Sequence, residues 1–342
     1  MQSKTKILLI YTGGTIGMMK DFETGALKAF NFSKLLQRIP ELKQLECAIE
    51  TISFKIPMDS SNMKIEDWVK MAEIIKDNYV LFDGFVVLHG SDTMSYSASA
   101  LSFMLENLNK PVVFTGSQLP IGDLRTDAKE NLITAIQLAS LQVHGVPAIQ
   151  EVGLYFEYKL YRGNRTTKIN AEHFNAFASP NYPELAESGV HLQVNTNFLL
   201  PLSPIAPLKL HANLDNNVVV IKLFPGINVS ILRAIFAIPN IKGVVLETYG
   251  AGNAPSDAWF ITILAEAIKR GVHIVNVTQC AAGSVNMGQY ETSTALKSIG
   301  VISGKDCTTE AAITKLMYLL GQNIAPANFK VAFETAIRGE MV

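Results

Sequence analysis

Residues 7–17 read Ile7-Leu8-Leu9-Ile10-Tyr11-Thr12-Gly13-Gly14-Thr15-Ile16-Gly17. The apolar run 7–10 is typical of a buried strand, and it leads into a glycine turn that carries two hydroxyl side chains. Such a turn can bring backbone N–H groups and a candidate nucleophile to one small ligand. A second turn of this kind, His-Gly-Ser-Asp-Thr at 89–93, follows the apolar run 84–88. Two hydroxyl-bearing turns indicate amide or ester chemistry that needs no metal.

In the rest of the chain, short β-rich runs alternate with amphipathic helical segments. This alternation is typical of an α/β fold with a largely parallel sheet. The pattern predicts strands at 84–88, 111–114, 218–221, 243–246 and 273–277, and helices at 65–79, 95–107, 126–143, 256–270 and 308–320.

The length of the chain predicts two domains, because 342 residues exceed what a single core usually supports. The alternating pattern is lost between 191 and 211, where Pro201, Pro204 and Pro207 interrupt the chain. We therefore expect an N-terminal catalytic α/β domain at 1–190, an interdomain linker at 191–211 and a C-terminal α/β domain at 212–342.

The composition excludes several kinds of partner. The net charge is only −1, so the chain has no electrostatic signal for nucleic acid or for an anionic membrane. The three cysteines form no CxxC pair, which favours reduced thiols in the cytoplasm. The apolar run 7–10 is too short for a signal peptide, and no stretch is long enough to span a bilayer. We expect a cytoplasmic protein.

Five polar clusters fall where strands are predicted to end, which is where open parallel sheets bind ligands. They lie at 12–15, 59–61, 89–93, 115–117 and 165–168. Caps and turns would explain any one cluster alone, but their joint placement favours a site. Within it, Lys168 could act as a base if burial lowered its pKa, with Asp92 balancing its charge. The alternative for Lys168 is a solvated basic loop.

Phosphate binding and metal catalysis find no support in the sequence. The glycine turn lacks the GxGxxG and GxxxxGK[ST] spacings of nucleotide sites. The six histidines show no metal-ligand spacing such as HExxH. What remains is covalent chemistry by a Thr or Ser hydroxyl, which needs a base to remove its proton.

Several motifs together resemble the bacterial-type L-asparaginase family, in particular its cytoplasmic type I branch. The matching segments are 11–18, 58–61, 89–94, 160–168, 176–181, 249–255 and 285–288. The resemblance implies a two-domain asparaginase fold, with a larger N-terminal and a smaller C-terminal α/β domain built on mainly parallel sheets. It also implies hydrolysis of L-asparagine to L-aspartate and ammonia without a cofactor or metal, by a homodimer or homotetramer.

The same resemblance implies roles for individual residues. Thr15 would be the nucleophile that forms an acyl-enzyme, and Ser91, Asp92 and Lys168 would activate it or the deacylating water. Backbone N–H groups of the two glycine turns would stabilise the oxyanion. The residues implied for substrate binding are Asp59, Ser60, Ser61, Gly90, Ser117 and Asn253, the last one across a subunit contact.

The chain departs from the family pattern at three places. Ser91 stands where the family usually has Thr, and the loop 22–27 lacks the Tyr that usually activates the nucleophile. Tyr290 is our candidate to replace that Tyr. Glu247 stands where some type I relatives use an Arg to bind asparagine allosterically, so we do not expect the same regulatory site.

Two other functions would share some of these motifs. An asparaginase-like subunit of a tRNA-dependent amidotransferase would need an added N-terminal domain and a basic surface. A non-catalytic asparagine sensor would need the substrate anchors, but not the retained set Thr15, Ser91, Asp92 and Lys168.

Overall fold

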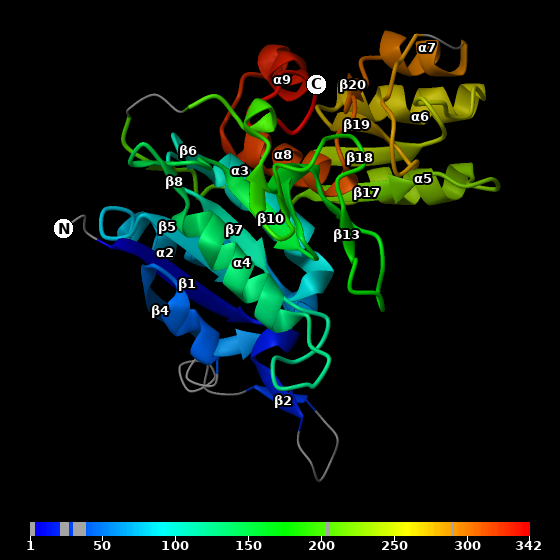
Figure 1. Cartoon of the computed structure of the whole chain (residues 1–342). Helices are drawn as coiled ribbons and strands as arrows, with labels where there is room; N and C mark the ends of the chain where they lie inside the picture. The colour runs from blue at the N-terminus through cyan, green and yellow to red at the C-terminus, as the bar shows by residue number, and fades with distance from the viewer. Residues whose placement is uncertain (1–3, 21–26, 30–38, 203–205, 289–290) are drawn as a thin grey trace. The chain divides into compact units, whose positions relative to one another are not determined.

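The computed structural model describes residues 4–20, 27–29, 39–202, 206–288 and 291–342. Its contacts divide the chain into an N-terminal unit, Met1–Ala212, and a C-terminal unit, Asn213–Val342. Each unit is built around its own mainly parallel β-sheet with helices packed on it (Figure 1).

Eight strands form the main sheet of the N-terminal unit, in the order β15-β14-β11-β10-β7-β5-β1-β4. The strands from β10 to β4 are parallel, whereas β11, β14 and β15 add an antiparallel edge. Their bounds are β1 (Thr5–Gly13), β4 (Cys47–Met58), β5 (Gly84–Leu88), β7 (Val112–Thr115), β10 (Val152–Phe156), β11 (Lys159–Arg162), β14 (Ala186–Ser188) and β15 (Leu192–Val194).

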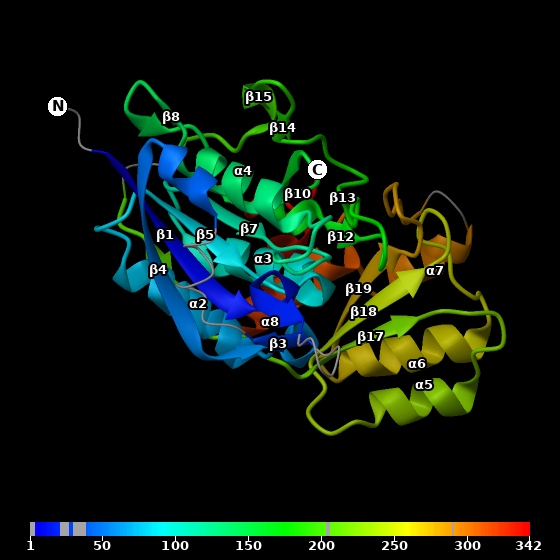
Figure 2. The ribbon, with the colours of Figure 1, turned by 60° about the horizontal axis from the view of Figure 1, so that its bottom comes forward.

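Both faces of this sheet are covered by helices. They are α2 (Ile65–Asp77), α3 (Met94–Met104) and α4 (Ala128–Ser140). Figures 1 and 2 show α4 on one face and α2 and α3 on the other. Ile7, Leu9 and Tyr11 on β1 belong to the same buried cluster as the apolar side of α4. Because side chains alternate along a strand, Leu8 and Ile10 are buried on the opposite face.

Shorter elements complete the N-terminal unit. Four two-stranded sheets pair β2 (Met18–Lys20) with β3 (Leu27–Ala29), β6 (Leu105–Glu106) with β16 (Lys209–Leu210), β8 (Gln142–Val143) with β9 (Val146–Pro147), and β12 (Thr167–Lys168) with β13 (Phe177–Ala178). Six 3₁₀ helices are η1 (Thr15–Gly17), η2 (Pro40–Gln44), η3 (Ser60–Asn62), η4 (Ser91–Thr93), η5 (Gly163–Arg165) and η6 (Thr196–Phe198). The stretch 191–211 thus includes β15, η6 and β16, and the domain bounds given above stay a prediction.

The C-terminal unit has one fully parallel sheet, in the order β17-β18-β19-β20. Figure 2 shows α5 and α6 side by side along this sheet. Val244, Leu246 and Ile274 share a buried cluster with these two helices. The elements are β17 (Val218–Lys222), β18 (Gly243–Thr248), β19 (His273–Thr278), β20 (Ile302–Ser303), α5 (Val229–Phe236), α6 (Ala258–Lys269), α7 (Glu291–Ser298), α8 (Thr309–Gly321) and α9 (Pro326–Glu334).

The predicted strands and helices are all present. β5 matches its prediction at both ends, and the other elements differ from theirs by a few residues at one or both ends. The largest correction concerns the helix predicted at 126–143, which ends at Ser140. The chain then forms the β8–β9 hairpin, where His144 and Gly145 have φ angles of 53° and 78°. Two consecutive left-handed residues are the mark of a tight hairpin turn. The helix itself ends because Leu141 has an extended backbone, with φ −69° and ψ 124°. Within the described residues, no helix has both the length and the apolar character to cross a membrane.

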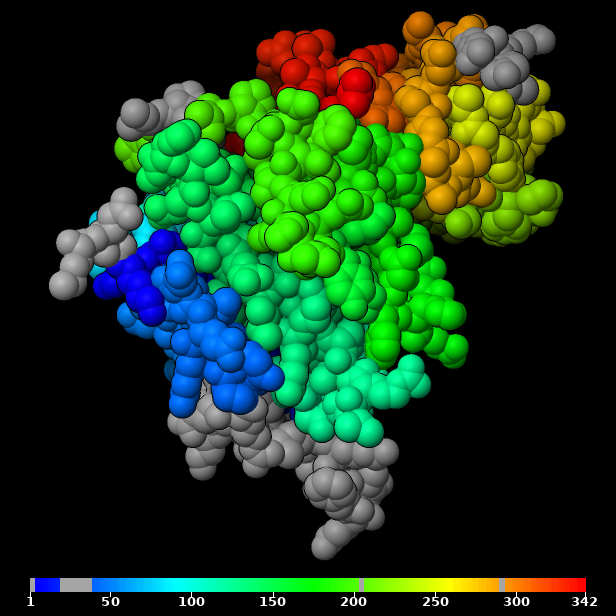
Figure 3. All heavy atoms as spheres, in the orientation of Figure 1, coloured from blue at the N-terminus to red at the C-terminus, as the bar shows by residue number. Residues whose placement is uncertain are grey.

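The surface of the N-terminal unit has an apolar cavity of about 610 Å³. It is lined by the β8–β9 hairpin and by residues between 194 and 202, two segments that lie side by side in the space-filling view (Figure 3). None of the sequence-predicted site residues lines this cavity. Those residues lie at the ends of the strands instead.

Candidate active site

The turn after β1 is held against the end of β4 by its glycines. Gly13 and Gly14 have φ angles of 135° and 83°, which a side chain would strain. A Cβ on Gly13 would lie 2.1 Å from the Met58 carbonyl oxygen, and the Gly14 N–H donates to that oxygen at 3.1 Å. Only glycine lets β1 and β4 approach so closely at this point.

The turn after β5 meets the first turn directly. A Cβ on Gly14 would lie 2.6 Å from the Gly90 Cα, and a Cβ on Gly90 would lie 2.5 Å from the Ser60 Oγ. In addition, the Thr93 hydroxyl donates to the Ser60 carbonyl at 2.8 Å. The ends of β1, β4 and β5 therefore converge, and they bring together the turns that carry Thr15, Ser60 and Ser91.

The two hydroxyls of the first turn differ in their availability. Thr12 is 1% exposed and donates its proton to the Leu88 carbonyl at 3.0 Å, which ties β1 to β5. Thr15 is partly exposed, and its hydroxyl has no hydrogen-bond partner within the described part of the chain. Thr15 therefore has the hydroxyl that a ligand can reach.

Lys168 joins the second turn through two hydrogen bonds. Its Nζ donates to Ser91 Oγ at 2.9 Å and to Asp92 Oδ1 at 2.7 Å. The Lys168 side chain is 18% exposed, whereas that of Asp92 is 61% exposed. Pairing of Lys168 with Phe177, between β12 and β13, fixes the backbone from which the lysine projects. Lys168 is thus held in a polar cluster rather than on a solvated loop.

The segment 59–61 is organised by its own hydrogen bonds. Asp59 Oδ1 accepts from the N–H and from the hydroxyl of Ser61, each at 2.9 Å. These bonds stabilise the carboxylate and lower the pKa of Asp59 below its usual value. Asp59 and Ser61 are exposed, while Ser60 is 3% exposed and lies against Gly90.

Ser117 follows β7 and is 2% exposed. Its hydroxyl donates to the Leu119 carbonyl at 2.6 Å, so it can only accept a hydrogen bond from a ligand. The neighbouring Gln118, which the sequence analysis did not single out, contacts the site directly, because its Oε1 accepts from Ser91 Oγ at 3.1 Å. The strand-end rule that selected Ser117 applies equally to Gln118.

Three further residues singled out in the sequence belong to the second half of the chain. Asn253 belongs to the C-terminal unit, where its backbone forms a bridge with Tyr249 through hydrogen bonds of 2.8 and 2.9 Å. Tyr290 lies outside the described residues. Glu247, on β18, accepts from the Thr309 hydroxyl at 2.6 Å and lies 3.6 Å from Lys222 Nζ.

An accessible threonine hydroxyl on one glycine turn lies beside a second turn whose Ser91 and Asp92 accept from Lys168, and such a set of residues suits covalent catalysis by a hydroxyl nucleophile. The family model described as "Asparaginase, N-terminal" matches residues 6–199, and that described as "Glutaminase/Asparaginase C-terminal domain" matches 217–333. The chain belongs to the asparaginase family, and the predicted two-domain fold and enzyme class are confirmed.

Individual relatives agree over the whole length of the chain. It is 45% identical to "L-asparaginase 1" of Escherichia coli (strain K12), over 100% of this chain and 99% of the relative. The crystal structure of L-asparaginase I from Vibrio cholerae matches with a TM-score of 0.90 and 42% identity, over 99% of this chain and 100% of the other. The thermostable L-asparaginase from Thermococcus kodakarensis matches with a TM-score of 0.89 and 34% identity, over 99% of both chains.

Proposed function

We propose that this chain hydrolyses L-asparagine to L-aspartate and ammonia, and that Thr15 is its nucleophile. The observation that carries the proposal is the contact of Gly14 with Gly90, which joins the Thr15 turn to the Ser91–Lys168–Asp92 group. Full-length similarity to L-asparaginases supports asparagine as the substrate.

The proposed reaction has two half-reactions. Thr15 Oγ attacks the side-chain carbonyl carbon of asparagine, the C–N bond breaks, and the amide nitrogen leaves as ammonia after gaining a proton. A water molecule then attacks the Thr15 ester, which releases aspartate and restores the hydroxyl. Lys168, with Ser91 and Asp92, is the group that moves the protons. N–H groups of the two glycine turns stabilise the oxyanion, a contribution of about 3–4 kcal/mol per donor in comparable sites.

The zwitterionic substrate needs an anion and a cation as anchors, so that its amide lies next to the hydroxyl. The exposed carboxylate of Asp92 is available for the α-ammonium group, since its Oδ1 alone is bonded to Lys168 in the described contacts. Ser60 is proposed to bind the α-carboxylate. Asp59, Ser61, Gly90 and Ser117 remain candidates for lining the same pocket.

Three further expectations stay proposals. Tyr290 is our candidate for the residue that activates Thr15. Asn253 is expected to complete the site of a neighbouring subunit in a homodimer or homotetramer, and the protein is expected in the cytoplasm. We also propose domain bounds of 1–190, 191–211 and 212–342.

Two isosteric substitutions on the same turn test the nucleophile. We expect Thr15→Val to lower kcat for asparagine by roughly 10³-fold or more, because the hydroxyl that forms the ester is lost. Thr12→Val is the matched control. It removes the bond to the Leu88 carbonyl, which we expect to cost about 1 kcal/mol of stability while turnover persists.

The assay follows ammonia release from asparagine and glutamine over a concentration series. Glutamine differs by one methylene, and pockets discriminate such a difference by about 1–3 kcal/mol, so a weaker side activity is expected. Saturable asparagine turnover by Thr15→Val at the wild-type rate would exclude Thr15 as the nucleophile. A wild-type protein that releases no ammonia would exclude the function itself.

A further inference from the structure

Ser91 lies between Lys168 and Gln118, and the direction of its hydrogen bonds is determined. Lys168 Nζ can only donate, so Ser91 Oγ accepts from it at 2.9 Å. The single proton of the hydroxyl is then directed to Gln118 Oε1, at 3.1 Å. Gln118 therefore holds the proton of Ser91, while the opposite side of the oxygen faces the lysine.

The orientation of the Gln118 amide is fixed by its surroundings. Its Nε2 donates to the Ala171 carbonyl at 3.2 Å and to the His173 carbonyl at 3.1 Å. If the amide were flipped, its oxygen would face two carbonyl oxygens and both donors would lose their acceptors. The amide oxygen must consequently point to Ser91.

The backbone of Gln118 is anchored as well. Its N–H donates to the carboxylate of Asp127, at 2.9 Å from Oδ2, and Asp127 is 7% exposed at the start of α4. The same carboxylate accepts from the Leu119 N–H at 3.1 Å. Gln118 is thus fixed at its backbone and at its side-chain nitrogen, and only its oxygen is directed into the site.

A serine hydroxyl needs such a partner more than a threonine hydroxyl does. Serine has no second substituent on Cβ, so three χ1 rotamers are sterically open to it. A β-branched side chain is much more restricted at χ1. In this chain the rotamer of Ser91 depends on the hydrogen bonds that its oxygen makes, and Lys168 supplies one and Gln118 the other.

We propose that Gln118 is a positioning residue for the reaction, which holds the Ser91 hydroxyl in the one rotamer that faces Lys168. The catalytic part of this inference rests on the proposed function, whereas the rotamer of Ser91 is a structural property. Loss of the Gln118 bond lets Ser91 occupy rotamers that point away from Lys168. Because misplacement of a reacting group by about 1 Å can cost about 10²-fold in rate, kcat is the parameter that should respond.

The kinetic test measures how far Gln118→Met lowers kcat for asparagine, once in the wild-type background and once in a Ser91→Thr background. Methionine keeps the length of the side chain but accepts no comparable hydrogen bond. In the wild-type background we expect kcat for asparagine to fall about 10- to 100-fold, with KM changed less than about threefold. In a Ser91→Thr background the same substitution should lower kcat less than about threefold, because the added methyl group restricts χ1 of residue 91. Each background is compared with its own Gln118 parent.

A second measurement does not depend on activity. In crystal structures, Ser91 should occupy one rotamer in the wild type, two or more in Gln118→Met, and one again when Ser91→Thr is combined with it. Gln137→Met is the matched control substitution, since Gln137 is exposed on α4, and it should change neither kcat nor the Ser91 rotamer.

Three results would overturn the proposal. One is a single Ser91 rotamer in Gln118→Met, and another is an equal loss of kcat in both backgrounds, which would assign Gln118 to holding the 171–173 segment. A raised KM with unchanged kcat would make Gln118 a substrate-binding residue instead. If the wild type does not hydrolyse asparagine, the proposed function fails, and the rotamer populations still decide whether Gln118 positions Ser91.

Discussion

His89 is wholly buried next to the turn that carries Ser91, and three hydrogen bonds determine where its ring proton lies. The Trp68 Nε1–H donates to Ser97 Oγ, at 2.9 Å. Ser97 therefore directs its own proton to His89 Nε2, also at 2.9 Å. The ring proton is then on Nδ1, which donates to the Gly90 carbonyl at 2.7 Å. His89 is neutral, and it binds the carbonyl of Gly90 in the turn that carries Ser91.

This arrangement predicts a loss of stability in mild acid. Burial lowers the pKa of His89 from 6.5 to about 4. Between these values the unfolded chain binds a proton that the native site excludes, so stability falls as the pH falls from 6.5 towards 4. The loss of unfolding free energy from His89 reaches about 3 kcal/mol when the full pKa shift contributes. Urea midpoints measured from pH 7.5 to pH 4.5 should show a shallower decline for His89→Asn, which cannot titrate.

The control is His191→Gln, since His191 is exposed in the same unit. It removes a histidine without removing a buried one, so its stability profile should follow that of the wild type. An acid decline of equal steepness in His89→Asn and the wild type would assign the loss to other groups and contradict the prediction.

At the scale of elements, the strands of the active-site region could be predicted because their sequences are continuous apolar runs that end in polar turns. β5, at Gly84–Leu88, matches its prediction at both ends. β4, at Cys47–Met58, could not be found in this way, because it is an edge strand whose residues are mostly partly buried or exposed. Its pattern contains no continuous apolar run.

The two glycine turns of the candidate site could be located from the sequence, but their contacts could not. The strand-end rule selects the clusters 12–15, 89–93 and 165–168, and the resemblance to the asparaginase family implies the roles of Thr15, Ser91, Asp92 and Lys168 within them. The contact between Ser91 and Gln118 joins residues 27 positions apart and depends on the adjacency of β5 and β7. The local sequence places Gln118 just after a predicted strand, but it does not show that its side chain contacts Ser91.

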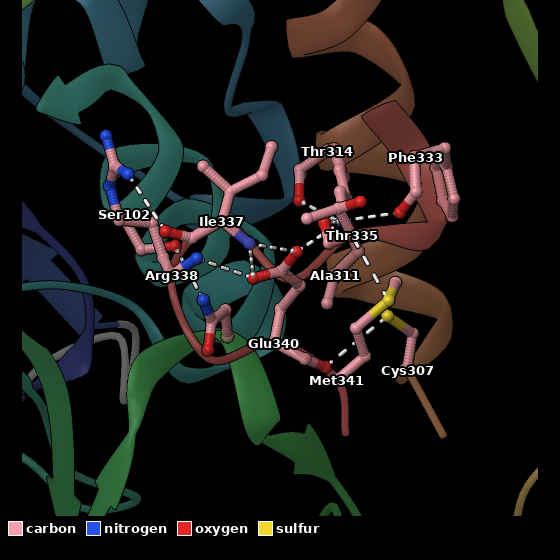
Figure 4. Close-up of polar contacts among 12 residues, drawn as sticks. Ser102, Cys307, Ala311, Thr314, Phe333, Thr335, Ile337, Arg338, Glu340 and Met341 are labelled. Atoms are coloured by element: carbon pink, nitrogen blue, oxygen red, sulfur yellow. Dashed lines mark hydrogen bonds and ion pairs between the residues drawn. The ribbon is translucent and has the colours of Figure 1, made fainter. Parts of the chain in front are cut away.

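The helix α8 carries a buried lysine that binds the segment 333–340. Lys315 is 0% exposed, and its Nζ is paired with the equally buried Glu340. The ammonium also donates to the carbonyls of Phe333 and Thr335, at 2.6 and 2.8 Å. Glu340 in turn accepts from the backbone N–H groups of Ile337 and Arg338 (Figure 4). The carbonyls of Phe333 and Thr335 and the N–H groups of Ile337 and Arg338 therefore all bond to the two members of this ion pair.

We expect Lys315→Met to destabilise the C-terminal unit by about 3–5 kcal/mol, because it leaves the Glu340 carboxylate buried without its counter-charge. Urea unfolding of the full chain measures this change. Lys330→Met is the matched control, since Lys330 and Glu334 form a partly exposed pair at 3.9 Å on α9, and it should cost less than about 0.5 kcal/mol. Similar losses of unfolding free energy in the two variants would contradict the prediction, because burial of the Lys315–Glu340 pair would then have no effect on stability.

At the scale of the molecule, each unit has a core of its own. The cluster beneath α4 in the N-terminal unit includes Leu132, and the cluster beneath α5 and α6 in the C-terminal unit includes Leu264. Both side chains are 0% exposed. Each is surrounded by residues of its own cluster, so the free energy that either one contributes belongs first to its own unit.

The two units should therefore open separately when one core is damaged. Leu132→Ala and Leu264→Ala remove the same atoms from two comparable sites, and each should destabilise its unit by about 2–5 kcal/mol. Native-state hydrogen exchange, read by mass spectrometry, would locate the effect. We expect Leu264→Ala to speed exchange in β17, β18 and β19 while β1, β5 and β7 keep their protection, and Leu132→Ala to do the reverse. If either variant lowered protection equally in both sheets, the two units would be a single cooperative structure, and the predicted division of the chain into two domains would have no thermodynamic meaning.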